Sequence, residues 1–303
     1  MNLPGEVKNI QGRIVKGIGG FYYVSDQDGR VHECKARGKF RKEKMTPMVG
    51  DIVEFVELEG YSSIEQILPR RNFLLRPAVA NVDSMLLVIS AGKPAPDLFL
   101  CDKLLIQAGC AGIKPVVVIN KSDENTAGID RLANQYCGYY DTFVVSARTG
   151  AGIEALKKMI SGLCVCFAGQ SAVGKSSIIN AIDPDFEQET GGLSKKTDRG
   201  KHTTRQAELL YVPAIHGYVV DTPGFSMYEI EGMQKNEISA HYPELQKFAG
   251  NCRFTSCLHD REPDCAVKDA VEAGEINKER YDRYLRIIHS LKESCLLYTS
   301  RCV

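Results

Sequence analysis

Gly169-Gln170-Ser171-Ala172-Val173-Gly174-Lys175-Ser176 fits the phosphate-loop pattern G-x-x-x-x-G-K-[ST]. The apolar run at residues 163–168 precedes it and a helical pattern at residues 177–182 follows, so we expect a strand, a glycine-rich turn and a helix. Backbone N–H groups of such a turn close around phosphate oxygens. Lys175 would bridge the β- and γ-phosphates, and the Ser176 hydroxyl would be a ligand of Mg²⁺. A chance match is the alternative, and this loop alone does not separate a GTPase from an ATPase or a small-molecule kinase.

The motif that would read the base lies earlier in the chain. Asn120-Lys121-Ser122-Asp123 ends the apolar run at residues 116–119, which places it at the carboxyl end of a strand, where doubly wound sheets bind ligands. The Asp123 carboxylate can accept hydrogen bonds from guanine N1–H and the exocyclic amine, a donor pair that adenine lacks. Asn120 would hold the loop and the base edge, and the Lys121 stem would cover the ring. A polar turn after a buried strand is the alternative. Because this motif usually follows the phosphate loop, the reversed order predicts a circularly permuted GTPase.

Two further segments fit a guanine-nucleotide site. Ser146 and Ala147 follow a strand pattern and resemble the loop that offers backbone amides to the guanine oxygen. Asp221 and Gly224 belong to Asp-Thr-Pro-Gly at a strand end, where the acid would hold Mg²⁺ and the Gly224 N–H would face the γ-phosphate, although a simple β-turn has the same composition. The predicted nucleotide contacts are Asn120, Lys121, Ser122, Asp123, Ser146, Ala147, Gly169, Gln170, Ser171, Ala172, Val173, Gly174, Lys175, Ser176, Ser177, Asp221 and Gly224.

The segment at residues 200–205 is rich in polar residues and predicts a switch in which Thr203 or Thr204 contacts Mg²⁺ when the γ-phosphate is present. Phe225 stands where many GTPases carry the glutamine that orients the attacking water. A phenyl ring cannot orient water, so His202 is the candidate for that task, with a solvated loop histidine as the alternative. We therefore expect slow intrinsic turnover that a partner accelerates.

Cys252, Cys257, His259 and Cys265 lie within fourteen residues and form a Cys₃His set, which is common in structural zinc sites. Disulfides and ordinary buried thiols are the alternatives. The N-terminal residues have no signal-peptide character and no apolar run is long enough for a membrane span, so we expect a cytoplasmic protein without membrane contact. A reducing compartment favours zinc over disulfides.

Composition is that of an ordinary globular chain with two or three domains, and a net charge of zero does not by itself indicate a nucleic-acid partner. Local charge does: the basic stretch at residues 35–44 would, if extended, direct Lys35, Arg37, Lys39 and Arg41 to one face, which suits a phosphate backbone. A solvated hairpin is the alternative. Short strand patterns near residues 12–15, 20–24, 30–34 and 50–56 predict a small five-stranded OB barrel, a fold that often binds RNA.

Alternating strand and helix patterns between residues 83 and 137 predict an α/β domain with a doubly wound sheet. Apolar residues at helical spacing around Gly274 predict two helices beside the zinc set. The multidomain α/β chain thus divides into an OB-fold RNA-binding domain at residues 1–70, a circularly permuted P-loop GTPase domain at residues 71–230 and a helical zinc-binding domain at residues 231–303.

Taken together, these motifs resemble the family of ribosome small-subunit-dependent GTPase A, from about Gly12 to Leu291, including the junction at residues 70–83. The resemblance implies GTP or GDP binding with Mg²⁺, GTP hydrolysis stimulated by the small ribosomal subunit during late assembly, one structural Zn²⁺, contacts with ribosomal RNA and a monomer. It also implies the zinc ligands and a catalytic role for Lys175, Thr203, Thr204 and His202. An RNA-binding scaffold with negligible turnover is the alternative.

Two features depart from the family. Ala172 replaces a glycine of the family's phosphate loop, which strains that turn if its φ is positive. The last nine residues, 295–303, do not resemble the family's usual ending, and we expect a truncation or a cloning addition there.

Overall fold

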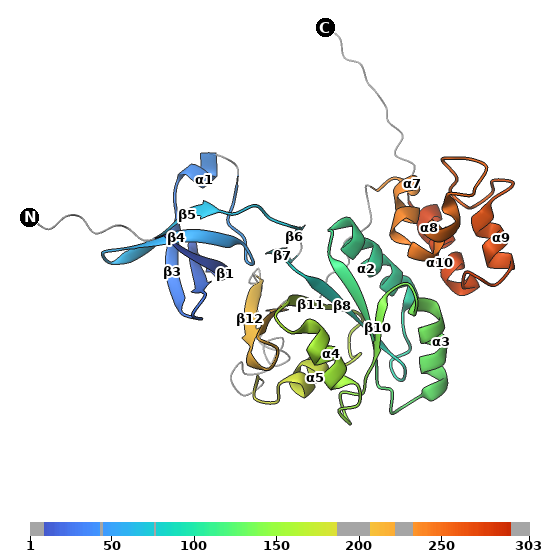
Figure 1. Cartoon of the computed structure of the whole chain (residues 1–303), viewed down its shortest axis with the longest axis horizontal. Coiled ribbons are helices and arrows are strands. Elements are labelled where there is room, and N and C mark those ends of the chain that lie inside the picture. The colour runs from blue at the N-terminus through green and yellow to red at the C-terminus, as the bar shows by residue number, and fades with distance from the viewer. Residues whose placement is uncertain (1–8, 43–44, 76, 187–206, 222–232, 292–303) are drawn as a thin grey trace, which may run out of the picture.

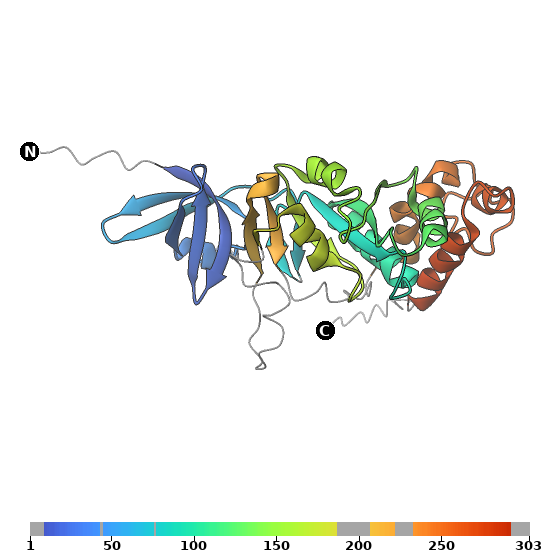
Figure 2. The ribbon, with the colours of Figure 1, turned by 90° about the horizontal axis from the view of Figure 1, so that it is seen from below.

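The structure is a computed structural model that describes residues 9–42, 45–75, 77–186, 207–221 and 233–291. Figure 1 shows three bodies in a row: a barrel at the N-terminal end, a sheet covered by helices, and a cluster of short helices. The same row appears from below in Figure 2, so the three bodies lie along one long axis. The fold class expected from the sequence is confirmed.

The N-terminal body is a closed barrel in the order β1-β2-β3-β5-β4, in which β3 and β5 run parallel and the other pairs are antiparallel. Its core contains Ile14, Val24, Phe55 and Ile64, all fully buried. The fifth strand had no separate signal in the sequence. The elements are β1 (Ile10–Ile18), β2 (Phe21–Asp26), β3 (Val31–Ala36), α1 (Lys39–Lys42), β4 (Ile52–Leu58) and β5 (Tyr61–Ile67).

The extended basic stripe predicted for residues 35–41 does not form. Strand β3 ends at Ala36, and the chain turns into the short helix α1. That turn buries Phe40 in the barrel core, where it is 4% exposed. An apolar side chain in the middle of the basic stretch therefore decided its conformation, because burying a phenyl ring outweighs a regular alternation of solvated charges.

A short hairpin joins the barrel to the central body. It consists of β6 (Phe73–Leu75) and β7 (Ala78–Ala80). The Arg70 guanidinium donates to both carboxylate oxygens of the buried Asp51 over 2.6 and 2.8 Å, and Asn81 Nδ2 donates to the Gly50 carbonyl over 3.0 Å. Gly50 has φ of 90°, and a Cβ there would lie 2.0 Å from the Ala80 carbonyl oxygen, so the close approach requires glycine.

The central body is a six-stranded sheet in the order β10-β9-β8-β11-β13-β12, parallel except for β12 at one edge. Its elements are β8 (Ser84–Ser90), α2 (Leu98–Cys110), β9 (Lys114–Asn120), α3 (Thr126–Tyr136), β10 (Asp141–Val144), α4 (Ile153–Ile160), β11 (Cys164–Ala168), α5 (Lys175–Ile182), β12 (Glu208–Val212), η2 (Pro213–Ile215) and β13 (Gly217–Asp221).

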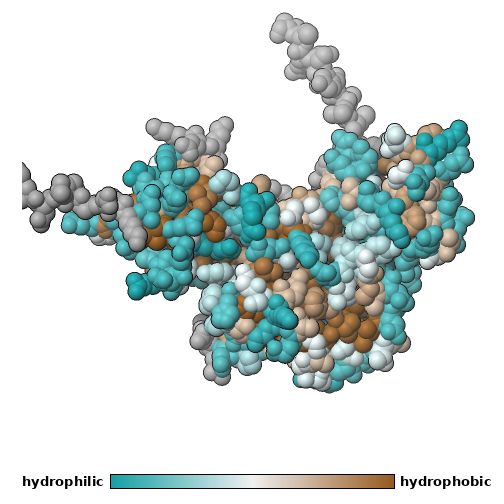
Figure 3. All heavy atoms as spheres, viewed as in Figure 1, coloured by the Kyte–Doolittle hydropathy of each residue, from teal (hydrophilic) through white to brown (hydrophobic). Residues whose placement is uncertain are grey.

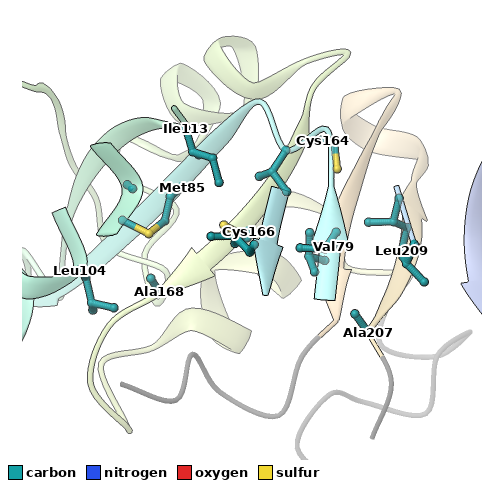
Figure 4. Close-up of a cluster of buried hydrophobic side chains, with 14 of the residues drawn as sticks. Val79, Met85, Leu104, Ile113, Cys164, Cys166, Ala168, Ala207 and Leu209 are labelled. Carbon is teal, nitrogen blue, oxygen red and sulfur yellow. The ribbon is translucent and has the colours of Figure 1, made fainter. Parts of the chain in front are cut away.

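Helices cover both faces of this sheet. Successive residues of β8 alternate between two cores: Met85 packs with residues of α2 and α3, and Leu86 packs with residues of α4 and α5. On β11, Cys164 and Cys166 join the first core (Figure 4). Strands buried on both faces read as continuous apolar runs, which is why the sequence indicated a doubly wound sheet.

The C-terminal body consists of short helices around a loop that carries the Cys₃His set. Ile238, Tyr242, Leu245, Tyr284 and Ile287 form its core. Gly274 has φ of 75° and separates the last two helices, as the sequence predicted. The elements are α7 (Lys235–Ile238), η3 (Ser239–His241), α8 (Pro243–Ala249), α9 (Ala266–Glu272) and α10 (Lys278–Ser290).

In the described part of the chain, no helix has the length and apolar character that crossing a membrane requires. Figure 3 shows hydrophilic residues over the outer surfaces of the barrel and the C-terminal body on the viewed face. Hydrophobic residues on this face are most extensive over the central body, and smaller hydrophobic areas also lie on the barrel and the C-terminal body.

Candidate functional site

The phosphate loop lies where the sequence placed it, between β11 and α5. Gly169 has φ of 125°, and a Cβ there would lie 2.3 Å from the Val88 carbonyl oxygen, so this glycine lets the loop cross the end of β8. Lys175 begins α5, and its Nζ donates to the carbonyl oxygens of Gly169 and Gln170 over 2.8 and 2.7 Å. Burial lowers the pKa of Lys175. The ammonium group is thus held inside the loop, where phosphate oxygens bind in this motif.

Ala172 has φ of 61°, in the left-handed region. An L-residue with a Cβ is strained in this region and glycine is not, so the loop is strained at Ala172, as expected for a positive φ. The neighbouring Val173 is buried, while Ser171 and Ser177 are exposed and Ser176 is half-buried in the first turn of α5.

Asn120 connects the base-reading loop to the phosphate loop. Its side chain is buried, with Nδ2 donating to the Val173 carbonyl over 2.9 Å and Oδ1 accepting from the Ala147 N–H over 3.1 Å. A Cβ on Gly174, which has φ of 99°, would lie 2.3 Å from this Nδ2. One amide side chain therefore fixes three predicted nucleotide segments relative to one another.

Asp123 lies at the same edge of the sheet. Its Oδ1 accepts from the Ser146 hydroxyl over 2.6 Å, and its Oδ2 forms an ion pair with Arg148. The Ser146 hydroxyl, followed by the backbone and Arg148, lowers the pKa of this carboxyl. An ionised, acceptor-only group is what recognition of two guanine donors needs. The Ser122 N–H donates to the Val145 carbonyl over 3.1 Å, which fixes the loop beneath it.

Lys121 has φ of 63°, and its Nζ donates to the Lys93 carbonyl. This contact connects the candidate nucleotide site to residues 91–97, a segment for which the sequence indicated no role. Within it, the Asp97 N–H donates to Gln170 Oε1 over 3.1 Å, and Asp97 caps α2 by accepting from the Leu100 N–H over 3.0 Å. In the sequence, the aspartate directly before an apolar helical pattern could have indicated that Asp97 caps this helix.

Asp221 ends β13. Because β11 and β13 are parallel and Cys166 lies opposite Val220, Asp221 is placed beside the strand that leads into the phosphate loop. This placement fits a hold on Mg²⁺ shared with Ser176. Gly224, His202, Thr203 and Thr204 lie outside the described residues.

The Cys₃His set converges on one point in the C-terminal body. The candidate ligand atoms of Cys252, Cys257, His259 and Cys265 all lie within 4.8 Å of one another. Sulfur–sulfur distances are 3.8 Å for Cys252 to Cys265 and 3.7 Å for Cys257 to Cys265, and His259 Nδ1 lies 3.5 Å from Cys252 Sγ and from Cys265 Sγ.

These distances match a metal tetrahedron. With zinc–sulfur bonds of about 2.3 Å and a zinc–nitrogen bond of about 2.0 to 2.1 Å, the sulfur–sulfur edges are about 3.8 Å and the sulfur–nitrogen edges about 3.5 Å. A disulfide needs sulfur atoms about 2.05 Å apart, so these thiols are not paired. Burial lowers the pKa of His259, which keeps the imidazole neutral as a metal ligand requires. The cluster fits a structural zinc.

Hydrogen bonds from neighbouring residues fix the loop that carries the cluster. Tyr281 and Tyr284 of α10 donate to the carbonyl oxygens of His259 and Leu258 over 2.5 and 2.6 Å. The Glu262 carboxylate accepts from the Leu258 and Asp260 N–H groups over 2.8 and 2.9 Å. Orientation of this kind is typical of metal ligands.

The candidate base-reading loop, the phosphate loop and Asp221 lie at the carboxyl ends of parallel strands, in the reverse of the usual chain order. This arrangement defines a circularly permuted GTPase that carries a barrel before its sheet and a Cys₃His module after it. The chain belongs to the RsgA GTPase family: residues 67–231 match the RsgA GTPase model and residues 11–62 match the RsgA N-terminal domain model. It is accordingly a GTP hydrolase.

Named relatives support this assignment over nearly the whole chain. The small ribosomal subunit biogenesis GTPase RsgA of Caldanaerobacter subterraneus subsp. tengcongensis is 47% identical over 292 residues, covering 95% of this chain and 97% of that protein. The protein of the same name from Ruminiclostridium cellulolyticum is 46% identical over 288 residues, covering 93% and 94%.

Solved structures have the same fold. YjeQ from Thermotoga maritima superposes with a TM-score of 0.82 at 37% identity and covers 93% of this chain and 98% of its own. YloQ, described as a circularly permuted GTPase, gives a TM-score of 0.79 at 32% identity and covers 95% and 97%.

Proposed function

We propose that this GTPase binds the small ribosomal subunit during late assembly and that GTP hydrolysis releases it from the subunit. The observation that carries the proposal is the full-length match to relatives named small ribosomal subunit biogenesis GTPase, which includes the barrel and extends beyond the GTPase segment. The barrel and the Cys₃His module would contact ribosomal RNA. Two modest contacts joined in one chain gain avidity through effective concentration. The protein would act as a cytoplasmic monomer without membrane contact.

Guanine nucleotide would bind across the three segments that Asn120 ties together. Asp123 would accept from the guanine donors, and the amides of residues 169–177 would close on the phosphates. Lys175 would exchange its bonds to two loop carbonyls for bonds to β- and γ-phosphate oxygens. Ser176 and Asp221 would hold Mg²⁺, which neutralises developing charge on the phosphates when bound.

The Cys₃His module would hold one structural Zn²⁺ through Cys252, Cys257, His259 and Cys265. Four protein ligands close the tetrahedron and leave no position for a reacting water, so the metal would stabilise the fold of the module. Residues 222–232 connect β13 to this module directly, so a change at the γ-phosphate would be passed to the module through Gly224 and the residues after it.

The test of this proposal is GTP hydrolysis with and without purified small ribosomal subunits. Strong stimulation by the small subunit, and none by the large subunit or with ATP in place of GTP, is expected. GTP binding without stimulation would favour the RNA-binding scaffold, the alternative motivated by Phe225 in the place of a water-orienting glutamine.

The catalytic roles of His202, Thr203 and Thr204 remain proposals from the sequence. In a His202→Ala variant we expect stimulated turnover to fall while GTP affinity is kept, because the side chain would orient water without binding nucleotide. Unchanged stimulated turnover with normal GTP affinity would remove His202 from the reaction.

A further inference from the structure

Helix α2 joins the candidate nucleotide site to the C-terminal body by contacts at two places about one and a half helical turns apart. Asp97 at its start is bonded to the phosphate loop, and Asp102 is buried against α10. Five residues of α-helix span about 7.5 Å, so the two contacts share one rigid segment. Every residue involved belongs to the described part of the chain, and none belongs to the expected switches.

The first contact region involves residues 91–97, which touch both nucleotide loops. Gln170 of the phosphate loop accepts from the Asp97 N–H, and Lys121 of the base-reading loop donates to the Lys93 carbonyl. Glu124 Oε2 accepts from the Lys93 N–H over 3.3 Å. Packing is tight here, because a Cβ on Gly92 would lie 2.1 Å from Glu124 Oε2. Displacement of this segment therefore displaces residues on both loops.

The second contact is a buried network of charges. Asp102, which is fully buried, accepts from Arg280 Nη1 and Arg283 Nε, each over 2.6 Å. Arg280 also pairs with Glu244, which is 1% exposed, and Arg283 Nη2 donates to Gln135 Oε1 over 2.8 Å. Removing one partner from such a network leaves an uncompensated buried charge, so the network holds α10 against α2 in a single geometry.

The same helix α10 also fixes the Cys₃His loop, through the hydroxyls of Tyr281 and Tyr284. Arg280 and Arg283 thus lie on one face of a helix that contacts α2, and the two tyrosines contact the carbonyls of Leu258 and His259. The chain of contacts runs from the phosphate loop through α2 and α10 to the candidate metal ligands.

We propose that α2 with residues 91–97 is a positioning element that couples nucleotide binding to zinc binding, so that each ligand strengthens the binding of the other. Asp102, Arg283 and Gln170 are its positioning residues. The inference rests on the proposed nucleotide and zinc sites, and it adds a route that bypasses the switches. Coupling between binding sites is reciprocal, so the factor by which GDP raises zinc affinity equals the factor by which zinc raises GDP affinity.

The experiment uses the full, zinc-loaded chain. Zinc affinity is measured by chelator competition without GDP and with saturating GDP, and the ratio of the two dissociation constants is the readout. In the wild type the ratio is expected to be about five or more, at the lower end of measured couplings. Arg283→Gln should bring it close to one. Gln170→Ala, a half-buried position in a loop, should do the same from the other end even if Arg283→Gln does not fold.

Arg131→Gln is the matched control. Arg131 of α3 donates to Glu279 of α10 over 3.0 Å, so the variant removes a pair between the same two bodies, but one that is exposed and does not involve α2. Its ratio should equal that of the wild type. A wild-type ratio of one, or a ratio unchanged by both Arg283→Gln and Gln170→Ala, overturns the inference. Failure to bind GDP or zinc at all would instead overturn the proposed sites, and the two titrations distinguish these results.

Discussion

Replacing Asp123 by Asn tests the base-reading site directly. In the structure, Asp123 Oδ1 accepts a 2.6 Å hydrogen bond from Ser146, and Oδ2 pairs with Arg148. Asn retains one carbonyl oxygen and replaces the other with an NH₂ group that only donates. If the remaining oxygen keeps the Ser146 bond, the NH₂ group takes the position of Oδ2 and faces both Arg148 and a guanine donor. The variant therefore places donor against donor where the wild type places acceptor against donor.

The size of the effect follows from the number of bonds changed. Guanine would donate from N1–H and from its exocyclic amine to an ionised carboxylate, and each hydrogen bond to a charged group contributes a factor of about ten to a hundred in affinity. Asn loses the bond at the Oδ2 position and turns the other into a bond to a neutral acceptor, so GDP binding should weaken by at least roughly ten- to a hundred-fold. Xanthine has a carbonyl oxygen in place of the exocyclic amine, so the Asn NH₂ group can donate to it and xanthosine diphosphate should gain affinity.

The assay is a titration of wild type and Asp123→Asn with GDP, xanthosine diphosphate and ADP. We expect the preference to reverse from GDP to xanthosine diphosphate, with ADP weak for both. Ser122→Ala is the matched control for base preference: it changes a side chain next to Asp123 but keeps the backbone N–H that bonds to Val145, so the variant should still prefer GDP to xanthosine diphosphate, whatever its GDP affinity. An unchanged GDP preference in Asp123→Asn would refute the assignment of this loop to the base.

Three further variants test other parts of the site. Ala172→Gly should stabilise the folded chain by about 1 kcal/mol in urea unfolding, because φ of 61° costs a residue with a Cβ about that much; destabilisation would contradict this account. Gly174→Ala should abolish GDP binding in a titration, since the new Cβ would lie 2.3 Å from Asn120 Nδ2. The control is Gly162→Ala, which is also at positive φ but has open space around it, and this variant should bind GDP normally. Cys257→Ser should lower the zinc content of the purified protein from one per chain, and normal stoichiometric zinc would argue against the ligand set.

Short-range patterns predicted where most residues of the candidate nucleotide site lie in the fold. A phosphate loop, its strand and its helix are adjacent in the sequence, so their pattern could be recognised without knowing the fold. Asn120 and Asp123 were assigned to the site in the same way, because a polar motif after a buried strand lies at the ligand-binding edge of a parallel sheet. The positions of the Cys₃His residues also follow from one local segment, and the structure adds the distances that a metal requires.

What the sequence could not predict depends on residues far apart in the chain. Asp102 and Arg280 are separated by 178 positions, and each alone resembles a charged residue on a solvated helix face. Strand β12 was not predicted. It forms by pairing with β13, and no local sequence pattern encodes the register of that pairing. The bonds between Gln170 and residues 91–97 likewise arise only when two strand ends meet in the sheet.

The two flanking bodies are anchored by buried polar groups that lie outside the expected switches. The barrel is held through the buried Asn81, whose Nδ2 donates to the Gly50 carbonyl, and the C-terminal body through Asp102. Breaking a buried ion pair such as Asp102–Arg280 costs about 3 to 5 kcal/mol, while the half-buried Lys16–Glu208 pair contributes about 1 kcal/mol or less. Glu208 lies opposite Asp221 in register, so this weak contact lies beside the residue that we propose as a holder of Mg²⁺. We therefore expect that a change at the proposed γ-phosphate position alters how the barrel meets β12 at little cost in free energy, while both anchors stay intact.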